Sequence, residues 1–445
     1  MEHLTRLSPS PFRRSGPGDG GASTWSRISP AARRIIAART ARSVGQGALV
    51  AAFTLYLRAL HWSAPEIGAL LSAGLLVGAA LTLWLGPLSD RLGRRQFLLG
   101  YELVLAACAA TALLAQSPWL IVPAAVLGGF GRGANGAAGP FGPLEQSWLA
   151  HGVAPQMRAR VFSLNATAGM LGMAAGAALG AAPQWLSALM PPDAAYRALF
   201  VLPLVGSAVG FVLLLQARDA PNSAADPAGP AADESPARPA ACDLRKRHRR
   251  ENGLLLRLGL VNSLNGLGIG MVAPLMAYWY AVRYGHGPDS IGPAMAATFV
   301  LAAVGAQVAS ALAQRIGVVS AVVAMRTAGL ILLVLTPMAP VFWLAAALYA
   351  LRATANQGTL GVRQALTVSL TGPDRRGLAA TVNNVSIQIP RAIGPVIAGL
   401  LLHQGWLFAP FVAAAAFQAV YLVLYRRFFR SVDPQRDEDA APSGE

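Results

Sequence analysis

A glycine-rich stretch at residues 128–148, GGFGRGANGAAGPFGPLEQSW, contains residue types that belong to two unrelated kinds of site. Gly131, Gly133 and Gly136 have the GxGxxG spacing of a loop that binds a dinucleotide phosphate. That loop needs a preceding strand and an acidic residue about twenty residues later. Here the preceding run, SPWLIVPAAVLGGF, is apolar, and no acidic residue follows at that distance. We therefore interpret the glycines as small-residue contacts between membrane helices, and Arg132 as a charge within such a helix.

Two further apolar stretches carry arginine and amide side chains, RATANQG at 352–358 and NNVSIQIPRAIGP at 383–395. In the second stretch, residues 384, 388 and 391 are spaced four and three apart, so they share one face of a helix. Buried charge is costly in a membrane, and this face should line a water-filled cavity or the interior of a helix bundle. The predicted substrate cavity contains Arg132, Asn135, Arg352, Asn356, Gln357, Asn383, Asn384, Gln388 and Arg391.

The charges of this predicted cavity favour an anionic substrate. Arg132, Arg352 and Arg391 each fall near the middle of an apolar segment, whereas Glu102 and Glu145 lie nearer the ends of theirs. Arginine stays protonated in proteins, and a carboxylate or phosphate group can pair with it through two hydrogen bonds. The alternative for each arginine is a structural role on backbone carbonyls or on a neighbouring glutamate. Glu102 is a candidate for proton coupling.

The elements that must position these residues are membrane helices. Of the 445 residues, 54% are hydrophobic and 13% are charged, against roughly 25% charged residues in soluble proteins. A helix needs about 20 apolar residues to cross a bilayer, and twelve windows approach that length. The sequence therefore predicts an all-α membrane protein with twelve transmembrane helices. The windows are 40–60, 66–86, 96–115, 119–144, 160–182, 196–216, 254–281, 289–312, 317–336, 340–367, 377–402 and 405–427.

The formal net charge of +16 has a distribution that indicates a membrane protein rather than a nucleic-acid-binding one. With twelve crossings, the arginine-rich segments all fall on one side, which the positive-inside rule assigns to the cytoplasm. We therefore expect a multi-pass protein of the inner (plasma) membrane with both termini in the cytoplasm. The two cysteines imply no disulfide framework. The arginine-rich segments are 33–42, 91–95, 158–160, 244–250, 375–376 and 425–429.

The chain is predicted to consist of two similar halves joined by a linker. A shift of 224 residues lays 66–93 on 290–317 without a gap and pairs Glu102 with Arg326, and a shift of 218 pairs Gln146 with Gln364. Such matches predict an internal duplication. The predicted organisation is a disordered basic N-terminal arm (1–38), an N-terminal six-helix bundle (39–216), a flexible cytoplasmic linker (217–252), a C-terminal six-helix bundle (253–430) and a C-terminal tail (431–445).

The segment GPLSDRLGRR, at residues 86–95, joins the second and third predicted helices. It resembles the signature G-x-L-a-D-r-x-G-r-[RK] of the major facilitator superfamily, and RGANGAAG resembles that family's fourth-helix pattern, with Asn135 replacing a glutamine. The resemblance implies a fold of two six-helix bundles. It also implies a conformational gate in which Asp90 faces the N-terminal end of the eleventh helix and the arginines pair with a carboxylate. The predicted gate residues are Gly86, Asp90, Arg91, Gly93, Arg94, Arg95 and Glu145.

These observations predict a secondary active transporter that moves a small molecule by alternating access. We favour an efflux permease for an organic anion or a drug-like compound. The alternatives are a proton-coupled importer of sugars or other nutrients, and a transporter-like membrane receptor that does not transport. No nucleophile–base pair or metal cluster is recognisable in the sequence, so we expect no enzyme and no cofactor. The expected partners are the small-molecule substrate, the lipid bilayer and protons as a coupling ion, without nucleic acid, and we expect a monomer.

Overall fold

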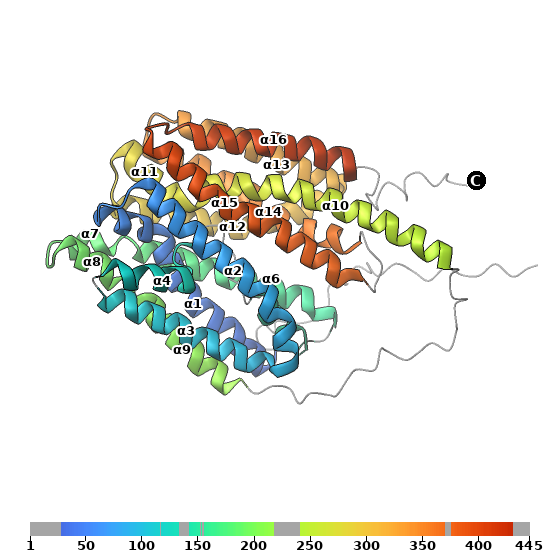
Figure 1. The fold of residues 1–445 in the computed structure, drawn as a ribbon, viewed down its shortest axis with the longest axis horizontal. Coiled ribbons are helices and arrows are strands. Elements are labelled where there is room, and N and C mark those ends of the chain that lie inside the picture. Colours follow the sequence, from blue (N-terminus) through green and yellow to red (C-terminus); the bar gives the residue numbers. More distant parts are fainter. Residues whose placement is uncertain are drawn as a thin grey trace, which may run out of the picture.

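The structure is a computed structural model that describes residues 28–115, 117–132, 142–151, 153, 155–217, 241–369 and 375–429. These described residues form helices joined by short connections, and they contain no strand (Figure 1). Within them, nine helical segments are long and apolar enough to cross a membrane. The prediction of an all-α membrane protein is confirmed.

The helices fall into two groups along the chain. Figure 1 shows the N-terminal helices, coloured blue to green, on one side and the C-terminal helices, yellow to red, on the other. The first group is α1 (Pro30–Ala59), α2 (Ala64–Leu92), α3 (Arg94–Leu114), α4 (Pro118–Gly128), α5 (Gly142–His151), α6 (Pro155–Leu179), α7 (Ala182–Leu186), α8 (Pro192–Ala198) and α9 (Val201–Gln216). The second group is α10 (Ala241–Val272), η2 (Ala273–Leu275), α11 (Met276–Tyr284), α12 (Pro288–Ile316), α13 (Val318–Leu335), η3 (Thr336–Met338), α14 (Phe342–Ser369), α15 (Arg376–His403) and α16 (Ala409–Phe429).

Two helices begin earlier than the sequence analysis predicted. The N-terminal arm was expected to extend to residue 38, but α1 begins at Pro30, where the Ser29 hydroxyl accepts a hydrogen bond from the backbone N–H of Ala32 at 3.2 Å. A serine cap followed by proline is a favourable helix start. The linker was expected to extend to residue 252, but α10 begins at Ala241. The proline-rich part of this segment ends at Pro239, and the following arginines and lysine are good helix formers.

The fourth predicted membrane helix is interrupted. A single helix was expected over residues 119–144, but α4 ends at Gly128. Gly129 and Gly131 follow with φ angles of 64° and 75°, which are left-handed conformations that glycine adopts at little cost and that end a helix. The interpretation of Gly131 as a helix–helix contact is therefore wrong. Arg132 lies in the turn after the break, and Gly133, Asn135 and Gly136 lie outside the described residues.

The pair α2–α3 has a close counterpart in the pair α12–α13. The four helices begin and end at positions that differ by 224 residues, apart from the C-terminal end of α13. Gly93 separates the first pair with a φ angle of 99°, and Gly317 separates the second with a φ angle of 86°. The helix α2 therefore continues through Leu92 instead of ending near residue 86 as predicted. The segment 86–95 forms the ends of two helices rather than a loop.

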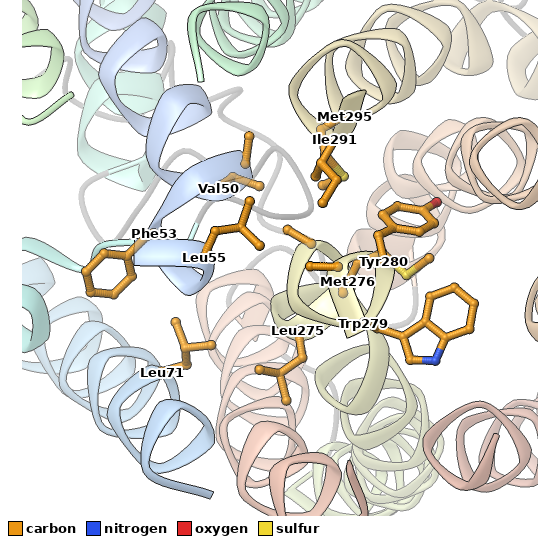
Figure 2. Packing of buried hydrophobic residues seen from close by; sticks show 14 of the residues in the cluster. Val50, Phe53, Leu55, Leu71, Leu275, Met276, Trp279, Tyr280, Ile291 and Met295 are labelled. Atoms are coloured by element: carbon orange, nitrogen blue, oxygen red, sulfur yellow. The ribbon is translucent and has the colours of Figure 1, made fainter. Parts of the chain in front are cut away.

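The two groups of helices pack against each other along two helix pairs. Helix α2 packs along α15, and α6 packs along α12. One large apolar core joins the groups: in Figure 2, Phe53 of α1 and Leu71 of α2 lie in the same cluster as Trp279 of α11 and Ile291 of α12. Two smaller cores lie near the end where α1 and α10 begin. The first is formed by N-terminal helices and the second by C-terminal helices. Among the described residues, the shared apolar core therefore does not extend to the end where α1 and α10 begin.

Candidate functional site

Two of the three arginines predicted to lie deep in the membrane meet between the two halves, and the third is linked to them through a tyrosine. The Nη2 atom of Arg391, on α15, donates a hydrogen bond to the carbonyl oxygen of Arg132 at 3.4 Å. The guanidinium carbon of Arg352, on α14, lies 5.7 Å from the centre of the Tyr349 ring. The same tyrosine lies within electrostatic range of Arg391. We refer to Arg132, Arg352 and Arg391 as the arginine trio.

The hydrogen bonds of the arginine trio explain part of its placement. The end of α4 leaves backbone carbonyls without helical partners, and cationic side chains are favourable at such an end. Arg132 donates to the carbonyl oxygen of Val126 at 3.3 Å, and Arg391 donates to Arg132 itself. Arg352 and Arg391 are each 5% exposed. Within the described part of the chain, the Nε atom of every arginine in the trio has no hydrogen-bond partner. The trio therefore keeps unused donors beside the helix break.

Other predicted cavity residues lie in different surroundings. The Asn383 amide oxygen accepts a hydrogen bond from Asn262 at 2.9 Å, within the C-terminal half. Asn356 packs against Gly329 of α13. Asn384 is exposed, whereas Gln357 and Gln388 are half-buried. The structure therefore brings the arginines together but assigns Asn383 and Asn356 to contacts between helices of one bundle.

Glu145, a predicted gate residue, has a different partner in the structure from the one expected. The resemblance implied a pair between Glu145 and an arginine of segment 86–95, but Glu145 forms an ion pair with Arg42 of α1. Arg95 instead donates to the carbonyl oxygen of Leu215 at 2.6 Å. This correction has a simple cause, because α1 packs between α5 and α9 and brings a second arginine into reach. Gly86 lies within α2, and the side chains of Asp90, Arg91 and Arg94 lie outside the described part of the structure.

A buried ion cluster around Arg42 was missed by sequence reasoning. One Nη atom of Arg42 pairs with Glu102 of α3, and the other pairs with Glu145 of α5. The three side chains are between 0 and 4% exposed, and Arg42 also lies over the Tyr101 ring at 5.6 Å. Two carboxylates on one guanidinium leave a negative charge, which the neighbouring Arg39 offsets. Arg39 and Arg42 lie at the arginine-rich edge of the predicted window 40–60, so the sequence indicated a topology-determining role rather than burial.

A pocket lies between the ion cluster and the arginine trio. It is small, and its lining also includes the apolar side chains of Leu49, Leu105 and Phe130. Arg42, Gln46 and Ser207 form its polar wall on one side, and Arg132 lies on the other. The glycines of the α4 break complete the wall. Because both Arg42 and Arg132 line the pocket, one member of the ion cluster and one member of the trio border the same small, mostly apolar pocket of the N-terminal half.

A second polar cluster, in the C-terminal half, also escaped the sequence analysis. Arg326 of α13 donates to the Asn265 amide oxygen at 2.8 Å and to the Thr359 hydroxyl at 3.1 Å. Arg363 of α14 donates to the Asn262 amide oxygen at 3.0 Å. Both guanidinium groups lie over the ring of Tyr421, at 5.5 and 5.7 Å. The available signal was the repeat, since the shift of 224 pairs Arg326 with Glu102 and the shift of 218 pairs Arg363 with Glu145.

Comparison with known proteins gives a consistent family match. The family model of the Major Facilitator Superfamily matches the chain twice, over residues 35–261 and 258–444. The multidrug resistance protein MdtH of Cronobacter sakazakii is 32% identical over 131 residues, which is 29% of this chain and 30% of that protein. The sequence match to this curated relative therefore spans less than a third of its length.

Solved structures share the fold at low sequence identity. A bacterial homolog of the human lysosomal transporter Spinster, in an inward-facing and unoccupied conformation, has a TM-score of 0.69 and 15% identity, covering 92% of this chain and 98% of that one. The human organic anion transporter MFSD10 has a TM-score of 0.53 and 18% identity, with coverages of 89% and 99%. At these identities the likeness concerns the arrangement of helices.

Proposed function

Because this chain belongs to the Major Facilitator Superfamily, whose members are transporters, we propose that it moves a small molecule across the cytoplasmic membrane by alternating access. In this proposal residues 28–217 and 241–429 act as two six-helix bundles, both termini are cytoplasmic, and the protein works as a monomer. The substrate is an organic anion or a drug-like compound with an anionic group, and the direction is export. The name of the MdtH relative, which is a multidrug resistance protein, supports export of drug-like compounds.

The arginine trio is the observation that carries the proposed substrate class. Its charges meet where the two halves face each other, and its Nε donors have no acceptor among the described residues. From Asn252 to Phe429 the sequence contains only two acidic residues, Asp289 and Asp374, and neither lies in the middle of a predicted apolar segment. A carboxylate, sulfonate or phosphate group on the substrate would offset this charge through paired hydrogen bonds.

The separation of the apolar cores supports alternating access. The shared core holds the halves together at one end, while the two separate cores allow them to part at the other. Rocking of two rigid bundles about a central site needs both a shared core that holds the bundles together and separate cores that keep each bundle folded. The helix contacts α2–α15 and α6–α12 are where such rocking would change the packing.

The ion cluster around Arg42 supports protons as the coupling ion. Two carboxylates share one guanidinium, and Glu102 and Glu145 each keep one oxygen without a hydrogen-bond partner in the described regions. Such a pair can accept a proton on one carboxylate while the other remains bound to Arg42. The pocket between Arg42 and Arg132 lies in the position needed to link this protonation to the substrate.

Transport in liposomes tests the proposed substrate class. Purified protein would be reconstituted with a panel of anionic, neutral and cationic fluorescent dyes of similar size, and their flux would be measured with and without a pH gradient. Arg352→Gln and Arg391→Gln are expected to reduce the flux of anionic dyes more than that of neutral ones. Arg197→Gln is the matched control, because Arg197 forms a peripheral i,i+4 pair with Asp193.

Two results would contradict the proposal. If Arg132→Gln, Arg352→Gln and Arg391→Gln all keep normal flux of every dye that the unmodified protein transports, the trio does not bind substrate. If the unmodified protein binds a dye but shows no counterflow in liposomes, it is a receptor rather than a transporter. A sugar flux that depends on protons and is insensitive to the trio would favour the importer alternative.

A further inference from the structure

The buried arginines of the C-terminal half fall into two separate groups. Arg352 and Arg391 belong to the arginine trio at the interface. Arg326 and Arg363 lie inside the bundle, 2% and 7% exposed, on opposite sides of the α13–α14 contact. Their hydrogen-bond acceptors are the neutral oxygens of Asn265, Asn262 and Thr359. Two positive charges are therefore buried on amide and hydroxyl groups, which is a costly arrangement without a negative charge nearby.

The N-terminal half has a different set of charges at the equivalent position. There, the residues that align with Arg326 and Arg363 are Glu102 and Glu145, and the guanidinium of Arg42 lies between them. The two carboxylates are thus bridged by one cation from the first helix of that half. In the C-terminal half the first helix supplies asparagines instead. The charges of the outer pair are inverted, and no ion pair among the described residues gives Arg326 or Arg363 a carboxylate in the bridging place that Arg42 has in the other half.

The groups around this bridging place are hydrogen-bond donors. The Nδ2 atom of Asn265 and the hydroxyl of Tyr421 are buried and have no hydrogen-bond partner among the residues that the structure describes. Asn265 is 3% exposed and Tyr421 is fully buried. The Tyr421 ring lies against both guanidinium groups. Nε and Nη1 of Arg326 and Nη2 of Arg363 already donate to neutral oxygens, so an anion would accept from the remaining guanidinium N–H groups. An amide N–H₂, a phenol O–H and two guanidinium groups form a set of donors that suits an anion.

We propose that Arg326, Arg363, Asn265 and Tyr421 form a structural binding site for a small monovalent inorganic anion such as chloride. The anion would occupy the place in the C-terminal half that corresponds to the Arg42 guanidinium in the N-terminal half. A small ion suits the site because helices α10, α13, α14 and α16 enclose it. This site is distinct from the arginine trio, and the inference does not rest on the proposed transport function.

Thermal unfolding of the purified full-length protein tests this site. The melting temperature Tm would be measured in sodium chloride and in sodium gluconate at equal ionic strength, over a range of chloride concentrations. Chloride is expected to raise Tm, because a ligand that binds the folded state stabilises it. Tyr421→Phe removes one donor and is expected to weaken chloride binding about tenfold or more, since a hydrogen bond to a charged group is being lost. Arg363→Gln is expected to abolish the response.

Arg391→Gln is the matched control, because it removes a buried arginine of the same half whose neighbours are Arg132 and Tyr349 rather than Arg326. It should keep the chloride response. Crystals grown in sodium bromide would then show an anomalous peak between Arg326 and Arg363. Equal Tm values in the two salts for the unmodified protein would overturn the proposal. So would an unchanged midpoint chloride concentration in Tyr421→Phe, which keeps the test valid if Arg363→Gln does not fold, or a bromide peak found at Arg352 and Arg391 instead.

Discussion

Removal of the Arg42 side chain should be among the most damaging single changes in the N-terminal half. Arg42→Gln would leave Glu102 and Glu145 facing each other without the cation that both now bind. Glu102 is fully buried and Glu145 is 3% exposed, so water cannot replace the guanidinium. Breaking a buried pair by removing one partner typically costs about 3–5 kcal/mol. We expect the free energy of unfolding to fall by about that amount.

The electrostatic part of this cost can be separated from the part that comes from lost packing. In the triple variant Arg42→Gln, Glu102→Gln, Glu145→Gln, the uncompensated negative charges are absent. Because replacing a whole buried ion cluster by neutral groups is far less costly than removing one member, the triple variant should recover at least half of the lost stability. The single, double and triple variants together form a mutant cycle that gives the interaction energy directly.

The assay is equilibrium unfolding of purified protein in mixed micelles with increasing sodium dodecyl sulfate, followed by tryptophan fluorescence. Arg197→Gln is the control, because its partner Asp193 is 47% exposed and an exposed i,i+4 pair contributes only about 0.5 kcal/mol. If Arg42→Gln destabilises the protein no more than Arg197→Gln does, the ion cluster does not exist in the folded protein. If the triple variant is less stable than Arg42→Gln, the cost lies in packing and the electrostatic reasoning is wrong.

Three further predictions concern packing, the chain ends and the gate. Gly176→Ala should lower the free energy of unfolding by about 1–3 kcal/mol, because its Cβ would overlap the carbonyl oxygen of Val44. Gly100→Ala should not destabilise the protein in the same assay, since nothing lies within 4 Å of its Cβ. Deletion of residues 2–26 together with 431–445 should leave dye transport unchanged, whereas deletion through Ser29 removes the α1 cap and should cost about 1 kcal/mol in unfolding free energy. Asp90→Asn should slow transport while dye affinity stays within a few-fold, and a large loss of affinity in a binding titration would contradict a gating role.

The sequence indicated the fold because the signals involved are local. Hydropathy marks a membrane helix within the helix itself, and a glycine between two apolar segments marks where one ends. Gly93 and Gly317 could therefore be matched by a shift of 224 residues, and both have positive φ angles in the structure. The helix break at Gly129 had the same kind of local signal. It was overlooked because the apolar composition continues past the glycines.

The grouping of the arginines was only partly predictable. Arg132, Arg352 and Arg391 were grouped because each lies deep in an apolar segment, and that depth can be counted along the chain. By its position along the chain, Arg42 was expected at the cytoplasmic edge of its segment. The position of Arg326 did not mark it as a buried residue. Whether an arginine at a given depth points into its own bundle or toward the other half depends on helix rotation, which tertiary packing determines.

Sequence alone thus determined that the chain is an all-α membrane protein of the Major Facilitator Superfamily, and it predicted a repeat of the two halves and a group of three arginines. Only the tertiary structure decided which charges meet. Arg42 is 60 residues from Glu102 and 103 residues from Glu145, and no local pattern encodes either pairing. In the other half, the residues that align with Glu102 and Glu145 are Arg326 and Arg363, and each donates a hydrogen bond to a neutral asparagine. The physical reason is that a helix forms from hydrogen bonds within a few residues, whereas a buried charge is stabilised by whichever side chains packing brings within hydrogen-bond distance.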